Sequence, residues 1–138
     1  MTLNGKKTPP TILVVDDHQP LLNLVKQILE NADFTVLAAS DANKALRIEA
    51  EFAGTIDLML SDVLMPGMSG PELARKMRER RPQTHILLMS AYPDGALLVL
   101  NEGWSFIQKP FLPRALVSRI KDVLQSKTHQ KRSLSTQK

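Results

Sequence analysis

The chain has 138 residues, a formal net charge of +4 and no cysteine. This length is sufficient for one domain with its own core, and the lack of cysteine excludes disulfides, thiolate metal sites and cysteine nucleophiles. No apolar run approaches the length of a membrane span and no signal-peptide pattern opens the chain, so we expect a cytoplasmic protein.

The basic charge is concentrated at the two ends of the chain. Residues 1–10 and 127–138 contain lysine and arginine but no acid, whereas residues 11–126 hold 12 basic and 14 acidic side chains, a net charge of −2. We therefore predict a disordered N-terminal segment over 1–10, a folded domain over 11–126 and a basic disordered tail over 127–138. The ends lack the interleaved aromatic residues that stack on single-stranded nucleic acid, which argues against a nucleic-acid partner.

The folded part opens with alternating strand-like and helix-like segments. The β-branched run TILVV at 11–15 is typical of a strand covered on both faces. From Pro20 to Leu29 apolar residues recur at helical spacing, and proline is favoured in the first turn of a helix. The segment FTVLAA at 34–39 predicts a second strand.

The same alternation continues through the middle of the chain. Residues 40–52 have a helical pattern, and either Ser40 or Asp41 could cap that helix. The apolar run DLMLS at 57–61 predicts a third buried strand. The segment GPELARKMRERR at 70–81 predicts a helix, with proline near its start and another proline directly after its end.

The last part of the domain contains two more predicted strands. HILLMS at 85–90 and WSFIQ at 104–108 are the fourth and fifth strands, and only a short helix over 94–101 fits between them. The amphipathic segment at 113–126 predicts the final helix. Five strand–helix units of this kind predict a single parallel sheet with helices on both faces.

Polar residues lie at the carboxyl ends of these predicted strands, where ligands bind in parallel sheets. They are Asp16, Asp17, Asp62, Ser90 and Lys109. Three neighbouring carboxylates would repel one another, and a hard divalent cation such as Mg²⁺ would relieve that repulsion. A lysine and a hydroxyl at the same edge could bind an added anion, so the set predicts phosphoryl transfer to a carboxylate.

Four motifs resemble the signatures of response-regulator receiver domains of two-component signalling. They are ILVVDD, DLMLSDVLMPGMSG, ILLMSAY and FIQKPF, and the resemblance covers residues 11–126. It implies an α/β fold, a single (βα)5 flavodoxin-like doubly wound parallel sheet with strand order 2-1-3-4-5. It also implies a phosphoacceptor signalling domain that catalyses only its own phosphorylation and dephosphorylation.

The resemblance implies specific roles for the acidic residues. Asp62 would accept a phosphoryl group from the phosphohistidine of a histidine kinase or a histidine phosphotransfer domain. Mg²⁺ (or Mn²⁺) would be held by Asp16, Asp17, Asp62 and the backbone carbonyl of Leu64, with Asp17 as the direct ligand of the acidic pair. Because Leu64 is apolar, we expect slower loss of phosphate than with an acidic residue at that position.

It also implies how the signal leaves the site. Lys109 would act with Asp62 in phosphorylation, and the peptide bond to Pro110 would be cis. Ser90 and Phe106 would form the switch. It would change the surface formed by helix 4 (94–101), strand 5 (104–108) and helix 5 (113–126).

One part of the chain departs from the family pattern. Lys109 follows Ser90 by 19 positions, fewer than the resemblance implies, so we expect the helix over 94–101 to be short or irregular. The segment at 90–111 is more similar to receivers of hybrid histidine kinases. The sequence therefore leaves two alternatives open, a stand-alone receiver and a receiver that is part of a hybrid histidine kinase.

Three other functions are alternatives to this interpretation. An aspartyl-phosphate phosphatase that resembles haloacid dehalogenases needs Asp-x-Asp after the first strand, but Asp16 and Asp17 are adjacent. A phosphate-independent interaction module with the same fold is the main alternative, although the complete set of acids, hydroxyl and lysine argues against it. A nucleic-acid binder would depend on the tail at 127–138 and would bind in a salt-dependent manner.

Overall fold

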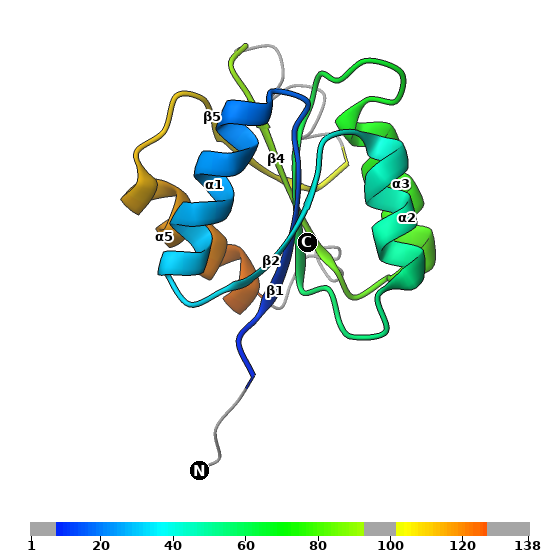
Figure 1. Cartoon of the computed structure of the whole chain (residues 1–138), viewed down its shortest axis with the longest axis horizontal. Helices are drawn as coiled ribbons and strands as arrows, with labels where there is room; N and C mark the ends of the chain where they lie inside the picture. The colour runs from blue at the N-terminus through cyan, green and yellow to red at the C-terminus, as the bar shows by residue number, and fades with distance from the viewer. Residues whose placement is uncertain (1–7, 93–101, 127–138) are drawn as a thin grey trace, which may run out of the picture.

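The computed structural model describes residues 8–92 and 102–126 of the chain (Figure 1). The strands and helices predicted within these ranges are all present, and their ends differ from the predicted ones by at most two residues. In chain order they are β1 (Thr11–Val15), α1 (Gln19–Asn31), β2 (Thr35–Ala39), α2 (Ala42–Glu51), β3 (Leu58–Asp62), α3 (Gly70–Arg80), β4 (His85–Ser90), β5 (Ser105–Gln108) and α5 (Pro113–Gln125).

Within the described residues, the strands form one parallel sheet in the order β2-β1-β3-β4-β5, as predicted. Helices α1 and α5 cover one face and α2 and α3 cover the other (Figure 1). Successive residues of β1 alternate between the two layers of the core: Ile12 packs on the α1 and α5 side, and Leu13 packs on the α2 and α3 side. The fold is therefore the doubly wound α/β architecture.

Side chains define where the helices begin. The N-terminus of α2 is capped by Asp41, whose carboxylate accepts a hydrogen bond from the backbone N–H of Lys44 at 2.7 Å, which decides between the two predicted caps. Helix α3 begins with a capping box in which Ser69 and Glu72 each bind the other's backbone N–H. These caps satisfy N–H groups that have no partner within the helix.

Arg81 joins α2, the loop after α2 and the end of α3. These contacts lie at the edge of the sheet opposite to the carboxyl ends of the strands. The guanidinium of Arg81 donates to the buried Glu49 carboxylate at 3.0 Å. It also donates to three backbone carbonyls, those of Glu49, Phe52 and Gly54. Arg80 forms a second ion pair with the same carboxylate at 3.1 Å. The burial of Glu49 is thus compensated by charge and by hydrogen bonds.

A second contact joins α3 to the start of β5. The guanidinium of Arg75 lies 6.0 Å from the ring centre of the buried Trp104 and forms a 3.0 Å ion pair with Glu102. Gly103 lies between these two partners with φ of +77°, a conformation that glycine adopts without steric cost.

Some sequence predictions lie outside the described residues. These are the short helix over 94–101, most of the N-terminal segment over 1–10 and the tail over 127–138. Among the helices that are described, none has both the length and the apolar character needed to cross a membrane.

Candidate functional site

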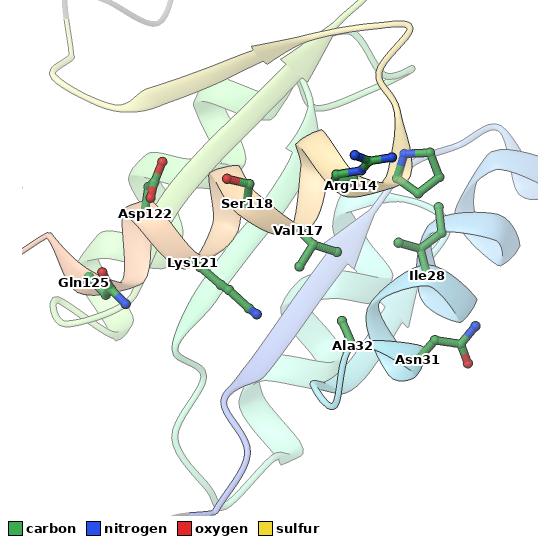
Figure 2. Close-up of a pocket in the computed structure, with 10 residues that line it drawn as sticks. Ile28, Asn31, Ala32, Arg114, Val117, Ser118, Lys121, Asp122 and Gln125 are labelled. Atoms are coloured by element: carbon green, nitrogen blue, oxygen red, sulfur yellow. The ribbon is translucent and has the colours of Figure 1, made fainter.

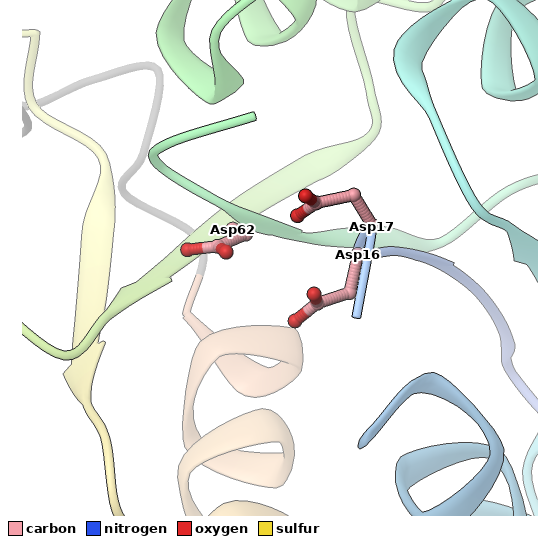
Figure 3. Close-up of side chains that lie close together, drawn as sticks. All are labelled: Asp16, Asp17 and Asp62. Atoms are coloured by element: carbon pink, nitrogen blue, oxygen red, sulfur yellow. The ribbon is translucent and has the colours of Figure 1, made fainter. Parts of the chain in front are cut away.

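Three carboxylates meet at the carboxyl ends of β1 and β3 (Figure 3). Asp16 and Asp17 directly follow β1, and Asp62 is the last residue of β3. Val15 pairs with Ser61 in the sheet, so the acids that come next on the two strands are neighbours. Asp16, Asp17 and Asp62 can each place one oxygen within 4.8 Å of the others. The structure thus brings together the three acids singled out in the sequence.

The two acids after β1 lie in different environments. Asp16 is fully buried, and its two oxygens accept hydrogen bonds from the backbone N–H of His18 at 2.8 Å and from Nζ of Lys109 at 3.0 Å. Asp17 is exposed. The oxygens of Asp16 therefore already have partners, and Asp17 is the member of the pair that is open to a cation from solvent.

Lys109 brings a positive charge into this group of acids. Its Nζ lies 3.0 Å from Oδ2 of Asp16 and 3.4 Å from Oδ2 of Asp62. Its backbone N–H donates to the carbonyl of Ser90 at 2.8 Å, and the peptide bond to Pro110 is cis, as the resemblance to receiver domains implies. Lys109 is thereby fixed against β4 and directed toward both carboxylates.

The environment of Asp62 disfavours its charged form. Burial raises the pKa of this carboxyl above its ordinary value, and the nearby charge of Asp16 raises it further. Lys109 and a backbone hydrogen bond from Leu64 lower the pKa of Asp62 but do not cancel the effect of burial. A cation placed among the acids would favour the ionised form, so the geometry suits a metal-dependent nucleophile.

The two residues predicted as a switch lie on one face of the sheet. Ser90 is the last residue of β4 and is buried, and its Oγ accepts a hydrogen bond from the backbone N–H of Tyr92 at 3.1 Å. Phe106 on β5 pairs with Leu88, which shares its face with Ser90 because side chains alternate along a strand. Phe106 is partly buried against the core cluster on the α2 and α3 side.

The loop between β3 and α3 completes this edge of the sheet. Leu64, the second residue after Asp62, has a side chain that is 52% exposed. Pro66 is followed by Gly67, whose φ of +83° requires a residue that tolerates a left-handed backbone. Ser61 is not among the residues predicted for the site. Its fully buried hydroxyl donates to the carbonyl of Asp62 at 3.0 Å. The feature of the sequence that could have indicated Ser61 is the presence of a serine within the apolar run DLMLSD.

A groove on the surface of the molecule is separate from these acids (Figure 2). This open groove of about 700 Å³ lies between α1 and α5, and none of the predicted site residues line it. A smaller groove of about 340 Å³ is lined by apolar residues of α1 and of the segment after β5, and Lys109 forms its edge. The smaller groove therefore borders the acidic site through Lys109.

Comparisons with known proteins agree with this geometry. Residues 12–121 match the response regulator receiver domain family. Sensor kinase CckA of Brucella abortus (strain 2308) is 31% identical over 118 residues, which are 83% of this chain and 12% of that kinase. Histidine kinase P4 of Formosa agariphila is 32% identical over 138 residues, 96% of this chain and 10% of that protein. The crystal structure of a receiver domain from hybrid histidine kinase CckA has a TM-score of 0.72 at 36% identity and covers 83% of this chain and 99% of that one.

The fold and the acidic site thus define a signalling domain, and the chain belongs to the family of response regulator receiver domains of two-component systems. It spans only about a tenth of the length of the two kinases to which it is similar.

Proposed function

We propose that Asp62 accepts a phosphoryl group from a phosphohistidine on a histidine kinase or a histidine phosphotransfer domain. The observation that carries this proposal is the position of Lys109, whose Nζ lies between the carboxylates of Asp16 and Asp62 at 3.0 and 3.4 Å. A fixed ammonium beside a carboxylate can pair with the oxygens of an incoming phosphoryl group and stabilise the charge that develops there.

The acidic residues fit a divalent cation, and we propose Mg²⁺ or Mn²⁺. Three carboxylate oxygens can approach within 4.8 Å of one another, and Asp17 is open to solvent. The cation would be held by Asp16, Asp17, Asp62 and the backbone carbonyl of Leu64. When bound, it supplies positive charge that offsets the repulsion among the carboxylates and the phosphoryl oxygens.

The chemical step uses residues of this chain in defined roles. An oxygen of Asp62 attacks phosphorus in line, a new O–P bond forms, and the P–N bond of the phosphohistidine breaks. The electron pair of that bond returns to the imidazole nitrogen of the donor. Lys109 pairs with the transferred group, and the product is an acyl phosphate. Water later hydrolyses this bond, releasing inorganic phosphate and regenerating the Asp62 carboxylate.

Ser90 and Phe106 would report the change to the surface. The Oγ of Ser90 accepts a hydrogen bond from Tyr92, so its own proton remains to be donated to a phosphoryl oxygen. Movement of this hydroxyl toward Asp62 would free space on the face that Ser90 shares with Phe106. Phe106 would then rotate inward, and the surface formed by β5 and α5 would change.

Phosphorylation by a small phosphodonor tests the proposal without a partner protein. We expect the wild-type chain to be labelled by acetyl phosphate in the presence of Mg²⁺ and not after chelation, and Asp62→Asn to take no label. Asp33→Asn is the matched control, because it makes the same change at an exposed acid whose positive φ suits asparagine. A chain lacking residues 127–138 should be labelled as well as the intact chain.

The same experiment decides between this function and a phosphate-independent interaction module. A folded wild-type chain that takes no label at any Mg²⁺ concentration would contradict the proposal and favour the module. Similarity to CckA makes a kinase the expected donor, and labelling by a purified kinase domain with bound phosphohistidine would establish it.

A further inference from the structure

The first residue of α3 lies unusually close to the backbone of the proposed phosphoacceptor. Gly70 is buried, and a Cβ added to it would overlap the carbonyl oxygen of Asp62. The same Cβ would lie 3.0 Å from the carbonyl carbon of Asp62 and 3.0 Å from Cα of Val63. These are backbone atoms of a strand end and the residue after it, which cannot move aside as a side chain can. Glycine is therefore required here for close approach.

Gly70 also closes the loop that follows Asp62. Its backbone N–H donates to the carbonyl of Val63 at 2.8 Å, and the N–H of Val63 donates to the carbonyl of Met89 on β4 at 2.8 Å. The two ends of the loop, Val63 and Gly70, are therefore hydrogen-bonded to each other, and Val63 is also hydrogen-bonded to β4. Leu64, whose carbonyl is a proposed metal ligand, lies directly after this point.

The Asp62 carbonyl is held from a second direction by the preceding residue. The hydroxyl of Ser61 is fully buried and donates to this oxygen at 3.0 Å. The backbone of Asp62 therefore has a hydrogen bond from Ser61 and a tight contact with Gly70, and little freedom to shift.

We propose that Gly70 is a positioning residue for the phosphoacceptor site, an inference that rests on the proposed function. The lack of a side chain lets α3 pack directly on the backbone of Asp62. This packing sets the positions of the Asp62 carboxylate and the Leu64 carbonyl relative to Asp16 and Asp17. Groups that orient metal ligands in this way affect metal affinity without touching the metal.

The test is Gly70→Ala, with Mn²⁺ binding to the unphosphorylated chain measured by electron paramagnetic resonance. We expect the dissociation constant for Mn²⁺ to rise about 10-fold or more. Labelling by acetyl phosphate should slow in parallel. In metal-free protein, hydrogen exchange of the Val63 amide should become faster, because the contact that holds this residue against β4 is displaced.

The matched control is Ala74→Gly, which weakens the same helix at a buried position but adds no atom near Asp62. We expect its Mn²⁺ affinity to equal that of wild type. Equal affinities for Gly70→Ala and wild type would overturn the inference, and so would an equal loss in Gly70→Ala and Ala74→Gly, since that would reflect helix stability alone.

Three further results bear on the role of Gly70. If Gly70→Ala does not fold, Ser61→Ala decides, because it removes only the hydroxyl that binds the same carbonyl; it should weaken Mn²⁺ binding, and unchanged binding overturns the inference. If the wild-type chain neither binds Mn²⁺ nor takes label, the proposed function fails and the inference falls with it. If wild type does both and Gly70→Ala does both equally well, only the inference fails.

Discussion

Nζ of Lys109 and Oδ2 of Asp16 lie 3.0 Å apart, although the two residues are 93 positions apart in the chain. Asp16 is fully buried and the Lys109 side chain is only 16% exposed, so water contributes little to the stabilisation of either charge. This ion pair connects the end of β1 with the residue after β5. It makes the candidate site a determinant of stability as well as of chemistry.

Replacing Lys109 should therefore destabilise the fold. Lys109→Met leaves the buried Asp16 carboxylate without its charged partner, and we expect the free energy of unfolding to fall by about 3 kcal/mol. Urea denaturation in the absence of divalent cations measures this loss, and added Mg²⁺ should restore part of it. Lys26→Met is the control, because its ion pair with Glu30 is exposed and is worth at most about 0.5 kcal/mol. Equal losses in both variants would contradict the prediction.

The raised pKa of Asp62 predicts a pH dependence of stability. Folding raises this pKa above the ordinary value of 3.8, so between the two pKa values the folded chain binds more protons than the unfolded chain. The contribution of Asp62 to stability therefore falls as the pH rises from about 3.8 through the folded pKa.

The side chain introduced by Asp62→Asn cannot ionise, so this variant does not lose stability as the pH rises through that interval. Without metal, we expect the variant to be more stable than wild type above that interval, and the difference to disappear below pH 3.8. Urea denaturation across the pH range measures both limits. A wild-type chain that is the more stable of the two at neutral pH would show that Lys109 outweighs the burial of Asp62.

The exposed side chain of Leu64 predicts a slow loss of phosphate. Leu64 follows Asp62 by two positions, its side chain is 52% exposed, and it cannot orient or deprotonate a water. In Leu64→Glu a carboxylate near the acyl phosphate could do so, and we expect hydrolysis to be about 10-fold faster. Decay of labelled protein after removal of the phosphodonor gives the rate. Leu112→Glu introduces the same charge at another exposed leucine and should leave the rate unchanged.

The Arg81 cluster predicts a large effect on stability at the opposite edge of the sheet. Arg81→Ala removes an ion pair and three hydrogen bonds to backbone carbonyls, and we expect a loss of about 3 kcal/mol. Arg80→Ala removes only the more exposed partner of Glu49 and should cost less than about 1 kcal/mol. Thermal unfolding followed by circular dichroism compares the two, and a larger loss for Arg80→Ala would disprove this ranking.

The sequence was sufficient to predict the sheet and the grouping of the acids. Buried β-branched runs such as 11–15 mark parallel strands, and parallel strands place their carboxyl ends at one edge. That rule predicts the proximity of four residues that follow or end the strands: Asp16, Asp17, Asp62 and Lys109. The cis peptide bond before Pro110 and the strand order were predicted from the resemblance to receiver domains.

Other features depend on distances that a linear pattern does not contain. The sequence left Ser40 and Asp41 as equal candidates for the cap of α2, because both residue types bind backbone N–H groups well and only the local backbone geometry selects Asp41. Gly70 looked like an ordinary helix start, and its contact with Asp62 becomes evident only when α3 is packed on the sheet. No pattern in the sequence predicts the hydrogen bond from Arg81 to the carbonyl of Gly54 in the loop after α2.

The contact between Arg75 and Trp104 provides an optical reporter. Trp104 is the single tryptophan of the chain, it is buried next to the start of β5, and Phe106 follows it by two positions. Indole fluorescence from the native protein therefore originates at one known place, under a guanidinium whose charge influences the emission wavelength. A rearrangement of β5 on phosphorylation would change that emission in real time, with no dye attached and no residue replaced.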